Sequence, residues 1–390
     1  MHIRHLSLSN FRNYRRLELD PPTGLLLFLG QNAQGKTNLL EAVHLLSTIR
    51  SPRATSDADL IHWEAPTDGP PIARLVAEAE RGSGEVRIEM TVRGPEDAPT
   101  GSRLRAGKRL RLNGLPQRAS QVVGRISSVF FTPQDLDLIG GPPSLRRRFL
   151  DITLSQADSH YLAALQEYTK VVVQRNALLR RIREGIARAD ELTFWESRMS
   201  ESGAYIAGAR SNAIGRLAGL AAIAHGDLSS GQEDLRLVYE PRWAEGWSAG
   251  DLAGKDQATL AAALLDTLSR RRQQEIGAGA SLWGPHRDDL LFLLDGRPAA
   301  AFASRAQWRT AALALRLAEA RFLLDATGDH PVLLLDDVLS EMDEARRHGV
   351  LDALSGFDQV WITSAEEQYV RSLVPAAHVF IVRAGEVSPG

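Results

Sequence analysis

The order of apolar and polar positions predicts an α/β architecture at both ends of the chain. Residues Gly24–Leu29 form a continuous apolar run, the pattern of a strand that is buried on both faces. A glycine-containing turn follows, and apolar residues then recur at helical spacing through Asn38–Leu46. The same rules predict strands at His2–Leu19 (with a turn at Asn10–Tyr14), Ile72–Glu80, Glu85–Val92, Leu104–Leu112, Val129–Phe131, Leu290–Leu294, Pro331–Leu335, Gln359–Thr363 and His378–Arg383.

The middle of the chain has the pattern of helices, in which Ala, Leu, Arg and Glu dominate. Helices are predicted at Ser144 to about Leu220, Gln257–Gln274, Gln307–Asp325 and Asp343–Leu354, with a turn-rich break at Trp247–Gly254. Ser304 is placed to cap one of these helices at its N-terminus. No heptad seam is sustained over residues 150–280, which disfavours a long coiled coil.

A phosphate-binding loop is predicted between the first buried strand and the helix that follows it. The segment matches G-x-x-x-x-G-K-[ST] and consists of Gly30, Gln31, Asn32, Ala33, Gln34, Gly35, Lys36 and Thr37, with Asn38 next in the chain. In this pattern, backbone N–H groups and the helix N-terminus face a polyphosphate. Gly35 permits close approach of the backbone, Lys36 is a point charge for the β and γ phosphates, and Thr37 can place its hydroxyl on Mg²⁺. The alternative is a chance match in an ordinary strand–turn–helix.

A pair of carboxylates ends a second buried strand. Val332–Leu335 is apolar, and Asp336 and Asp337 follow it directly. In a parallel sheet this order delivers both side chains to the carboxyl edge, where ligands of α/β proteins bind. Asp336 is then suited to hold Mg²⁺ directly or through water, and Asp337 to orient or deprotonate an attacking water. The alternative is that the two acids cap the next helix. The two motifs lie about 300 residues apart, so a second lobe is expected between them.

The composition excludes several classes of protein. The chain has no cysteine, which rules out a disulfide framework, a thiolate zinc site and a cysteine nucleophile. No run approaches the ~20 apolar residues of a membrane span, and the N-terminus lacks the apolar core of a signal peptide, so a cytoplasmic location is expected. The net formal charge of −2 is no signature of nucleic-acid binding, so the local distribution of charge has to be considered instead.

Five sequence strings together resemble the RecF family of bacterial DNA replication and repair proteins, and they occur in the expected order over nearly the whole chain. The strings are Phe11–Tyr14, Lys36–Ala42, Ser144–Asp151, Gly284–Leu290 and Leu333–Asp343. The strings at 144–151 and 284–290 are much more specific than the phosphate loop alone.

The resemblance implies an ABC-type ATPase head, related to SMC-like repair ATPases. It implies a P-loop α/β lobe formed by residues 1–125 and 325–390, and a mainly helical lobe at 126–324 that carries the signature segment. In this class two heads enclose two ATP molecules, and each ATP is closed by the signature segment of the other head. The resemblance therefore implies an ATP-dependent homodimer on DNA, slow hydrolysis of ATP, and work with RecO and RecR in loading RecA at gaps.

The same resemblance assigns roles to single residues. Arg12 falls where the family contacts nucleotide phosphate, Gln134 falls near a segment that responds to Mg²⁺, and Ser304 falls in the signature segment that reaches the partner's γ-phosphate. Asp337 and Lys36 remain the candidate catalytic residues. The signature departs from the family at Ala306, where Gly is usual, and at Trp308, where Gln is usual. Both departures bear on the strength of ATP-driven dimerisation.

A basic stretch suggests where DNA could bind. Residues 101–125 contain seven basic residues and no acid, and the candidate DNA contacts among them are Arg103, Arg105, Lys108, Arg109 and Arg111. Such clusters supply salt-dependent contacts to phosphates. If the strand alternates, Arg109 and Arg111 face outward and the leucines face the core. Without interleaved aromatic residues, the backbone of a duplex is favoured over stacked bases. The alternative is a solvated basic face.

Other basic clusters, including Arg146, Arg147 and Arg148, could extend such a surface. His286, beside two carboxylates, is read as part of a hydrogen-bonded cluster in preference to a metal ligand.

Three other functions fit parts of the sequence. The nucleotide-binding subunit of an ABC transporter lacks the expected switch histidine here and leaves the helical lobe unexplained. An SMC-like architectural protein is disfavoured by the missing coiled coil. A P-loop transferase would need no signature helix. Co-purification with membranes would favour the transporter, and a phosphorylated product other than inorganic phosphate would favour the transferase.

Overall fold

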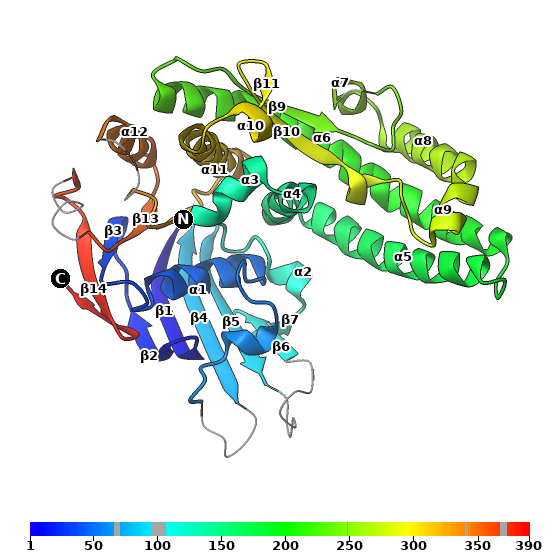
Figure 1. Cartoon of the computed structure of the whole chain (residues 1–390). Helices are drawn as coiled ribbons and strands as arrows, with labels where there is room; N and C mark the ends of the chain where they lie inside the picture. The colour runs from blue at the N-terminus through cyan, green and yellow to red at the C-terminus, as the bar shows by residue number, and fades with distance from the viewer. Residues whose placement is uncertain (66–70, 95–106, 248, 340–341, 343, 367–372) are drawn as a thin grey trace. The chain divides into compact units, whose positions relative to one another are not determined.

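The chain folds into two compact units. The computed structural model describes residues 1–65, 71–94, 107–247, 249–339, 342, 344–366 and 373–390. Unit 1 comprises Met1–Asp135 and Glu319–Gly390, and unit 2 comprises Leu136–Ala318 (Figure 1). The sequence placed the boundaries at 125/126 and 324/325. Strand β8 pairs with β12, so the segment after residue 125 belongs to the first unit and not to the helical one.

Unit 1 contains a mostly parallel sheet in the order β15-β14-β3-β13-β12-β8. Its strands are β3 (Gly24–Leu29), β8 (Ser128–Phe131), β12 (Val332–Asp336), β13 (Gln359–Ser364), β14 (His378–Arg383) and β15 (Glu386–Pro389). Only the β14–β15 pair is antiparallel. The carboxyl ends of β3, β13, β12 and β8 therefore lie at one edge of the sheet.

The second sheet of unit 1 has the strand order β2-β1-β4-β5-β6-β7, and its pairs are antiparallel. Its strands are β1 (His2–Phe11), β2 (Tyr14–Leu19), β4 (Ile72–Arg81), β5 (Gly84–Arg93), β6 (Gly107–Leu112) and β7 (Leu115–Gln117). Side chains alternate between buried and outer positions along β5, as expected for a sheet with one face on the core.

Helix α1 (Lys36–Thr48) contacts strands of both sheets, and the main hydrophobic core contains residues from all three. It begins after Gly35, whose φ of 114° favours glycine, and it ends at Ile49 in the left-handed region. The other short elements of this unit are α2 (Ala119–Val122), α12 (Glu344–Leu354), and the 3₁₀ turns η1 (Asp57–Leu60) and η2 (Pro133–Asp135).

Unit 2 is mainly helical and also contains a three-stranded sheet in the order β11-β10-β9 (Figure 1). Its strands are β9 (Leu235–Glu240), β10 (Asp289–Leu294) and β11 (Arg297–Pro298). Its helices are α3 (Leu136–Gly140), α4 (Pro143–Ala157), α5 (Ser159–Arg183), α6 (Leu192–Ser229), α7 (Ala249–Ala253), α8 (Gln257–Arg270), α9 (Arg272–Ala278) and α10 (Ala299–Phe302), with the 3₁₀ turns η3 (Ala189–Glu191) and η4 (Pro285–Arg287). Helix α11 (Arg305–Thr327) begins in this unit. Helix α6 packs against both α5 and α8.

The segment from 144 to about 220, predicted to be helical, forms three helices, α4, α5 and α6. Asp158 interrupts it, because its side chain accepts a hydrogen bond from the backbone N–H of His160 and caps α5. Gly185, with a φ of 73°, lies in the turn that separates α5 from α6. The apolar pattern did not predict β9, β15, the short helix α7 and several other short elements. Of the predicted strand at 104–112, residues 107–112 form β6 and the rest lies outside the described residues.

Among the helices of the described ranges, none has both the length and the apolar character needed to cross a membrane.

Candidate nucleotide-binding site

The predicted phosphate loop connects β3 to α1, and its backbone carbonyls accept hydrogen bonds from its own lysine. Lys36 Nζ donates to the carbonyl oxygens of Gly30 at 2.6 Å and Gln31 at 2.9 Å. The N–H of Gly30 donates to the carbonyl of Ser364 at the end of β13, at 3.3 Å. A Cβ at Gly30 would lie 2.3 Å from the carbonyl oxygen of Val382, so this position has no room for a side chain. The loop is thereby fixed at the carboxyl edge of the parallel sheet.

Residues from two other turns hold the loop in place. Asn13 donates through Nδ2 to the carbonyl of Gln34 at 3.0 Å and accepts from Asn38 Nδ2 at 2.8 Å. The backbone N–H of Gly385 donates to the same Gln34 carbonyl at 3.0 Å, and Tyr14 donates to the carbonyl of Gly35 at 2.9 Å. Burial raises the pKa of Tyr14, which keeps it a donor. The sequence assigned no role to Asn13, although it lies in the string Phe11–Tyr14.

The structure brings the phosphate loop and the strand-end carboxylate together. Thr37 Oγ1 lies 2.8 Å from both carboxylate oxygens of Asp336, although the two residues are 299 positions apart. Thr363, on the neighbouring strand β13, donates to Asp336 Oδ1 at 2.9 Å and accepts from the N–H of Asp337 at 3.0 Å. Thr363 is a residue of the site to which the sequence analysis gave no such role. Its signal was its place at the end of a buried strand.

One ammonium and two carboxylates lie close together in the site. Burial lowers the pKa of Lys36, while the carboxylates of Asp337 and Asp336 raise it. Lys36 and Asp336 are both buried. Asp337 has a φ of 52°, a left-handed conformation that is uncommon for a residue with a side chain. An ammonium, a hydroxyl and two carboxylates therefore share one edge of the sheet, which suits an anionic ligand that carries a divalent cation.

The residues at this edge fit Mg²⁺. The Thr37 hydroxyl and the Asp336 carboxylate are the hard oxygen donors that this ion prefers. Within the ranges that the structure describes, no group of three His, Asp or Glu side chains forms a metal cage. In nucleotide sites Mg²⁺ is usually held by one or two carboxylates or hydroxyls of the protein, and phosphate oxygens and water complete its coordination. Gln134, in η2 just after β8, is exposed at the same edge of the sheet.

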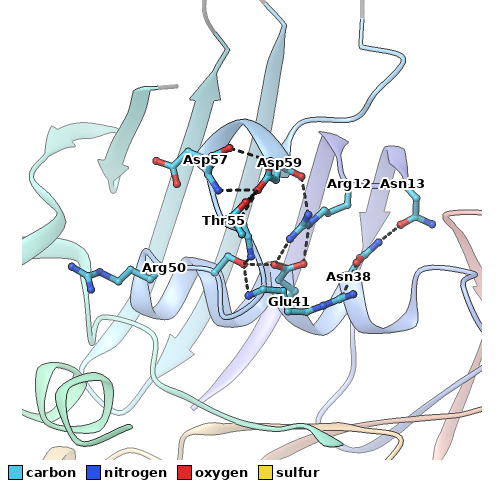
Figure 2. A network of polar contacts seen from close by, with 12 residues as sticks. Arg12, Asn13, Asn38, Glu41, Arg50, Thr55, Asp57 and Asp59 are labelled. Carbon is cyan, nitrogen blue, oxygen red and sulfur yellow. Dashed lines mark hydrogen bonds and ion pairs between the residues drawn. The ribbon is translucent and has the colours of Figure 1, made fainter. Parts of the chain in front are cut away.

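Arg12 is bound within the protein. Its Nε and Nη2 donate to the two carboxylate oxygens of Glu41 at 3.0 and 2.7 Å, and its Nη1 donates to the carbonyl of Asp59 at 2.8 Å. Figure 2 shows this bidentate contact beside the pair of Asn13 and Asn38. Glu41 is fully buried, so its carboxylate needs the guanidinium. A contact of Arg12 with nucleotide phosphate stays a prediction.

Ser304 lies in unit 2, at the N-terminus of α11. Its Oγ accepts from the N–H of Gln307 at 3.3 Å, and its own N–H donates to Gln307 Oε1 at 2.8 Å. This reciprocal pair is a capping box, which confirms the predicted cap. Ser304 and Ala306 are both exposed.

The candidate DNA contacts have different surroundings. Arg103 and Arg105 lie outside the described residues. On β6, Arg109 and Arg111 are exposed and Leu110 is buried, which confirms the predicted alternation. The Lys108 ammonium is bound internally instead, at 3.0 Å from the carbonyl of Ile49 and 2.6 Å from the carboxylate of Asp57.

The string Gly284–Leu290 forms a buried hydrogen-bonded cluster. His286 Nε2 donates to the carbonyl of Ser281 at 3.0 Å, so Nδ1 accepts from the hydroxyl of Tyr168 at 2.7 Å. Burial lowers the pKa of His286 to about 4, which keeps the ring neutral. These contacts fit the prediction that His286 belongs to a hydrogen-bonded cluster.

The run Arg146–Arg148 was predicted to add to a basic surface, and for Arg146 this is wrong. Its guanidinium is buried and donates to both oxygens of Asp289, at 2.8 and 3.0 Å. Arg147 donates to the carbonyl of Asp288 at 2.8 Å.

A phosphate loop that meets a strand-end carboxylate, in an α/β unit interrupted by a helical one, defines the class of ABC-type and SMC-like P-loop ATPases. The family model of the RecF/RecN/SMC N terminal domain matches residues 2–388. The DNA replication and repair protein RecF of Roseiflexus castenholzii is 43% identical over 100% of both chains. The chain belongs to the RecF family.

Solved structures agree with this membership. A structure of the recombination mediator protein RecF-ATP in the RecFOR pathway is 29% identical, covers 100% of this chain and 97% of that one, and superposes with a TM-score of 0.86. An SMC head bound to the C-terminal winged-helix domain of ScpA is 16% identical and covers 100% of this chain and 98% of that one. Its TM-score of 0.53 shows a likeness of fold alone.

Proposed function

We propose that this chain is an ATP-dependent DNA-binding protein of recombinational repair and replication-fork maintenance. It forms an ATP-driven dimer on gapped or duplex DNA and helps to load RecA together with RecO and RecR. ATP is hydrolysed slowly, in a DNA-dependent reaction that resets the dimer. Membership of the RecF family and the likeness to a solved structure from the RecFOR pathway support this proposal.

The contact of Thr37 with Asp336 is the observation that carries the nucleotide part of the proposal. The loop from Gly30 to Asn38 cradles the phosphates with its N–H groups, and Lys36 exchanges its loop carbonyls for β and γ phosphate oxygens. Thr37, Asp336 and Gln134 would hold Mg²⁺, which neutralises phosphate charge when bound. Asp337 orients or deprotonates the attacking water.

The remaining site residues act in the dimer and on DNA. Arg12 adds a positive charge near the phosphates, and Ser304 of one head closes the ATP of the other. DNA phosphates are contacted by the basic stretch, for which Arg109 and Arg111 are exposed on β6. Arg103 and Arg105 belong to the same proposal, whereas the internal ion pair of Lys108 gives that residue a role within the fold.

Sedimentation with and without ATP·Mg²⁺ and a gapped duplex tests the proposal. We expect ATP to convert the monomer to a dimer and DNA to join it. Lys36→Ala should abolish ATP-dependent retention on DNA, and Asp337→Asn should trap ATP and favour the dimer. A protein that stays monomeric at saturating ATP, or a Lys36→Ala variant with unchanged retention, would contradict the proposal. Product analysis tells a phosphotransferase from an ATPase.

A further inference from the structure

Gln307 connects the N-terminus of α11 to the body of unit 2. Its Oε1 accepts from the N–H of Ser304, and its Nε2 donates to Glu233 Oε1 at 2.9 Å. The second oxygen of Glu233 faces Nε2 of His225 at 3.5 Å, and His225 is fully buried on α6. The capping box is thus hydrogen-bonded to Glu233, whose other carboxylate oxygen lies near α6.

Trp308, the next residue, forms a second attachment. Its Nε1 donates to the carbonyl of Ala299 at 2.8 Å. Its ring lies directly on Gly140, where an added Cβ would be 2.2 Å from Cη2 and 2.4 Å from Cζ3 of the indole. Gly140 therefore provides the space that the ring occupies. Ala306, by contrast, is exposed and takes no part in this packing.

We propose that Gln307 and Trp308 are positioning residues, which fix Ser304 and the first turn of α11 for contact with a phosphate. This inference rests on the proposed function. The capping box uses the N–H groups of Ser304 and Gln307 internally. The proton of the Ser304 hydroxyl and the N–H groups of Arg305 and Ala306 are not used by the capping box, and they are the donors that this turn can offer to a phosphate. Two attachments on adjacent residues limit how far this turn can rotate or fray.

The departures Ala306 and Trp308 have different consequences under this proposal. Ala306 alters the exposed surface that a phosphate would approach. Trp308 alters only how the segment is anchored, because both its N–H and its ring are engaged inside unit 2.

A charge-swap cycle tests the Gln307 attachment. Gln307→Glu keeps an acceptor for the N–H of Ser304 but places a second carboxylate against Glu233. Glu233→Gln keeps an acceptor for Gln307 and is the matched control. In the double variant, the amide introduced at 233 can donate to the carboxylate introduced at 307. We expect Gln307→Glu to weaken ATP-dependent dimerisation about tenfold or more, and the double variant to recover most of it. Binding of a fluorescent ATP analogue to the monomer should not change.

Hydrogen exchange separates this inference from the proposed function. The amides of residues 307–309 should exchange faster in Gln307→Glu and return to the rate of the unmodified protein in the double variant, whether or not dimers form. Unchanged exchange in Gln307→Glu, or a double variant as fast as the single one, would overturn the Gln307 attachment. Failure of the unmodified protein to dimerise with ATP would refute the proposed function. The exchange rates would still show whether Gln307 holds the turn.

The Trp308 attachment has its own test. Gly140→Ala should displace the ring, speed exchange at 307–309 and weaken the ATP-dependent dimer, with ATP-analogue binding unchanged. Gly215→Ala on α6 is the control, because a Cβ there meets nothing within 4 Å. If Gly140→Ala behaves like Gly215→Ala in both measurements, Trp308 has no positioning role.

Discussion

Replacing Asp288 by Asn should change how the stability of the protein depends on pH. The Asp288 carboxylate is buried, accepts from the hydroxyl of Tyr239 at 2.5 Å and accepts from the N–H of Arg242 at 3.1 Å. Burial is the main cause that raises the pKa of Asp288 from 3.8 to about 7, against the opposing effect of these donors. The unfolded chain releases this proton near pH 3.8, whereas the folded protein keeps it up to about pH 7. Between these two pH values the folded state therefore holds more protons than the unfolded state.

The sign and the size of the effect follow from proton linkage. When the folded state binds more protons than the unfolded state, the free energy of unfolding falls as pH rises. One pKa unit corresponds to ~1.4 kcal/mol, so the raised pKa of Asp288 removes on the order of 4 kcal/mol between pH 4 and 7. His286 acts in the opposite direction. Its pKa is lowered from 6.5 to about 4, so its contribution to stability is lost as pH falls through this range.

The two contributions oppose each other in the unmodified protein between about pH 4 and 6.5. Asp288→Asn removes only the contribution of Asp288, which falls as pH rises. The assay is urea unfolding followed by tryptophan fluorescence at several pH values, for the unmodified protein and the variant. We expect the difference in unfolding free energy, unmodified minus variant, to fall steadily from pH 4 to 7. Asp190→Asn, at an exposed ion pair, is the control. A difference that does not change with pH would refute the reasoning.

Four further substitutions test single residues. Arg146→Met should cost ~3–5 kcal/mol in thermal unfolding because it removes the bidentate partner of the buried Asp289 carboxylate and leaves it the longer contact with Arg242 at 3.5 Å. Removing that carboxylate as well should restore part of the loss, and a double variant no better than the single one would contradict this. Lys108→Ala should lower the free energy of unfolding by about 1 kcal/mol and leave the salt dependence of DNA binding unchanged. Arg109→Ala should lower the slope of that salt dependence by ~1. Equal slopes for the two variants would remove Arg109 from the proposed contacts. Gly30→Ala should weaken binding of an ATP analogue about tenfold or more, because the new Cβ would lie 2.3 Å from the carbonyl oxygen of Val382 and displace the loop. Unchanged affinity would show that the loop tolerates this displacement.

The sequence was sufficient to place the centre of the site but not its supports. The phosphate loop is a local motif, and Asp336 follows a buried strand, so a rule about the edges of parallel sheets brings them together. Thr363 and Asn13 could not be found in this way, because their roles depend on which strands and turns become neighbours. No local pattern contains that information.

Charge was the feature that the sequence predicted least well. Arg146 and Lys108 both lie in basic stretches, and both are engaged inside the fold. A basic residue looks alike in a sequence whether it faces solvent or a buried carboxylate, because its partner is distant in the chain. On β6, by contrast, the period of two separates Arg109 and Arg111 from the buried Leu110, so the alternation of a strand carried reliable information.

The separation of the phosphate loop from Asp336 does not weaken the site, because the sheet order compensates for it. Strand β13 pairs with β3 on one side and β12 on the other, and its Thr363 lies in register with Phe28 of β3 and with Asp336 of β12. The cost of closing a loop grows only by ~0.6 kcal/mol for each doubling of its length. Residues 136–318 also form a compact unit of their own, so they do not act as a long flexible loop. The insertion therefore costs the sheet little, and the geometry of the site depends on three neighbouring strand ends rather than on the length of chain between them.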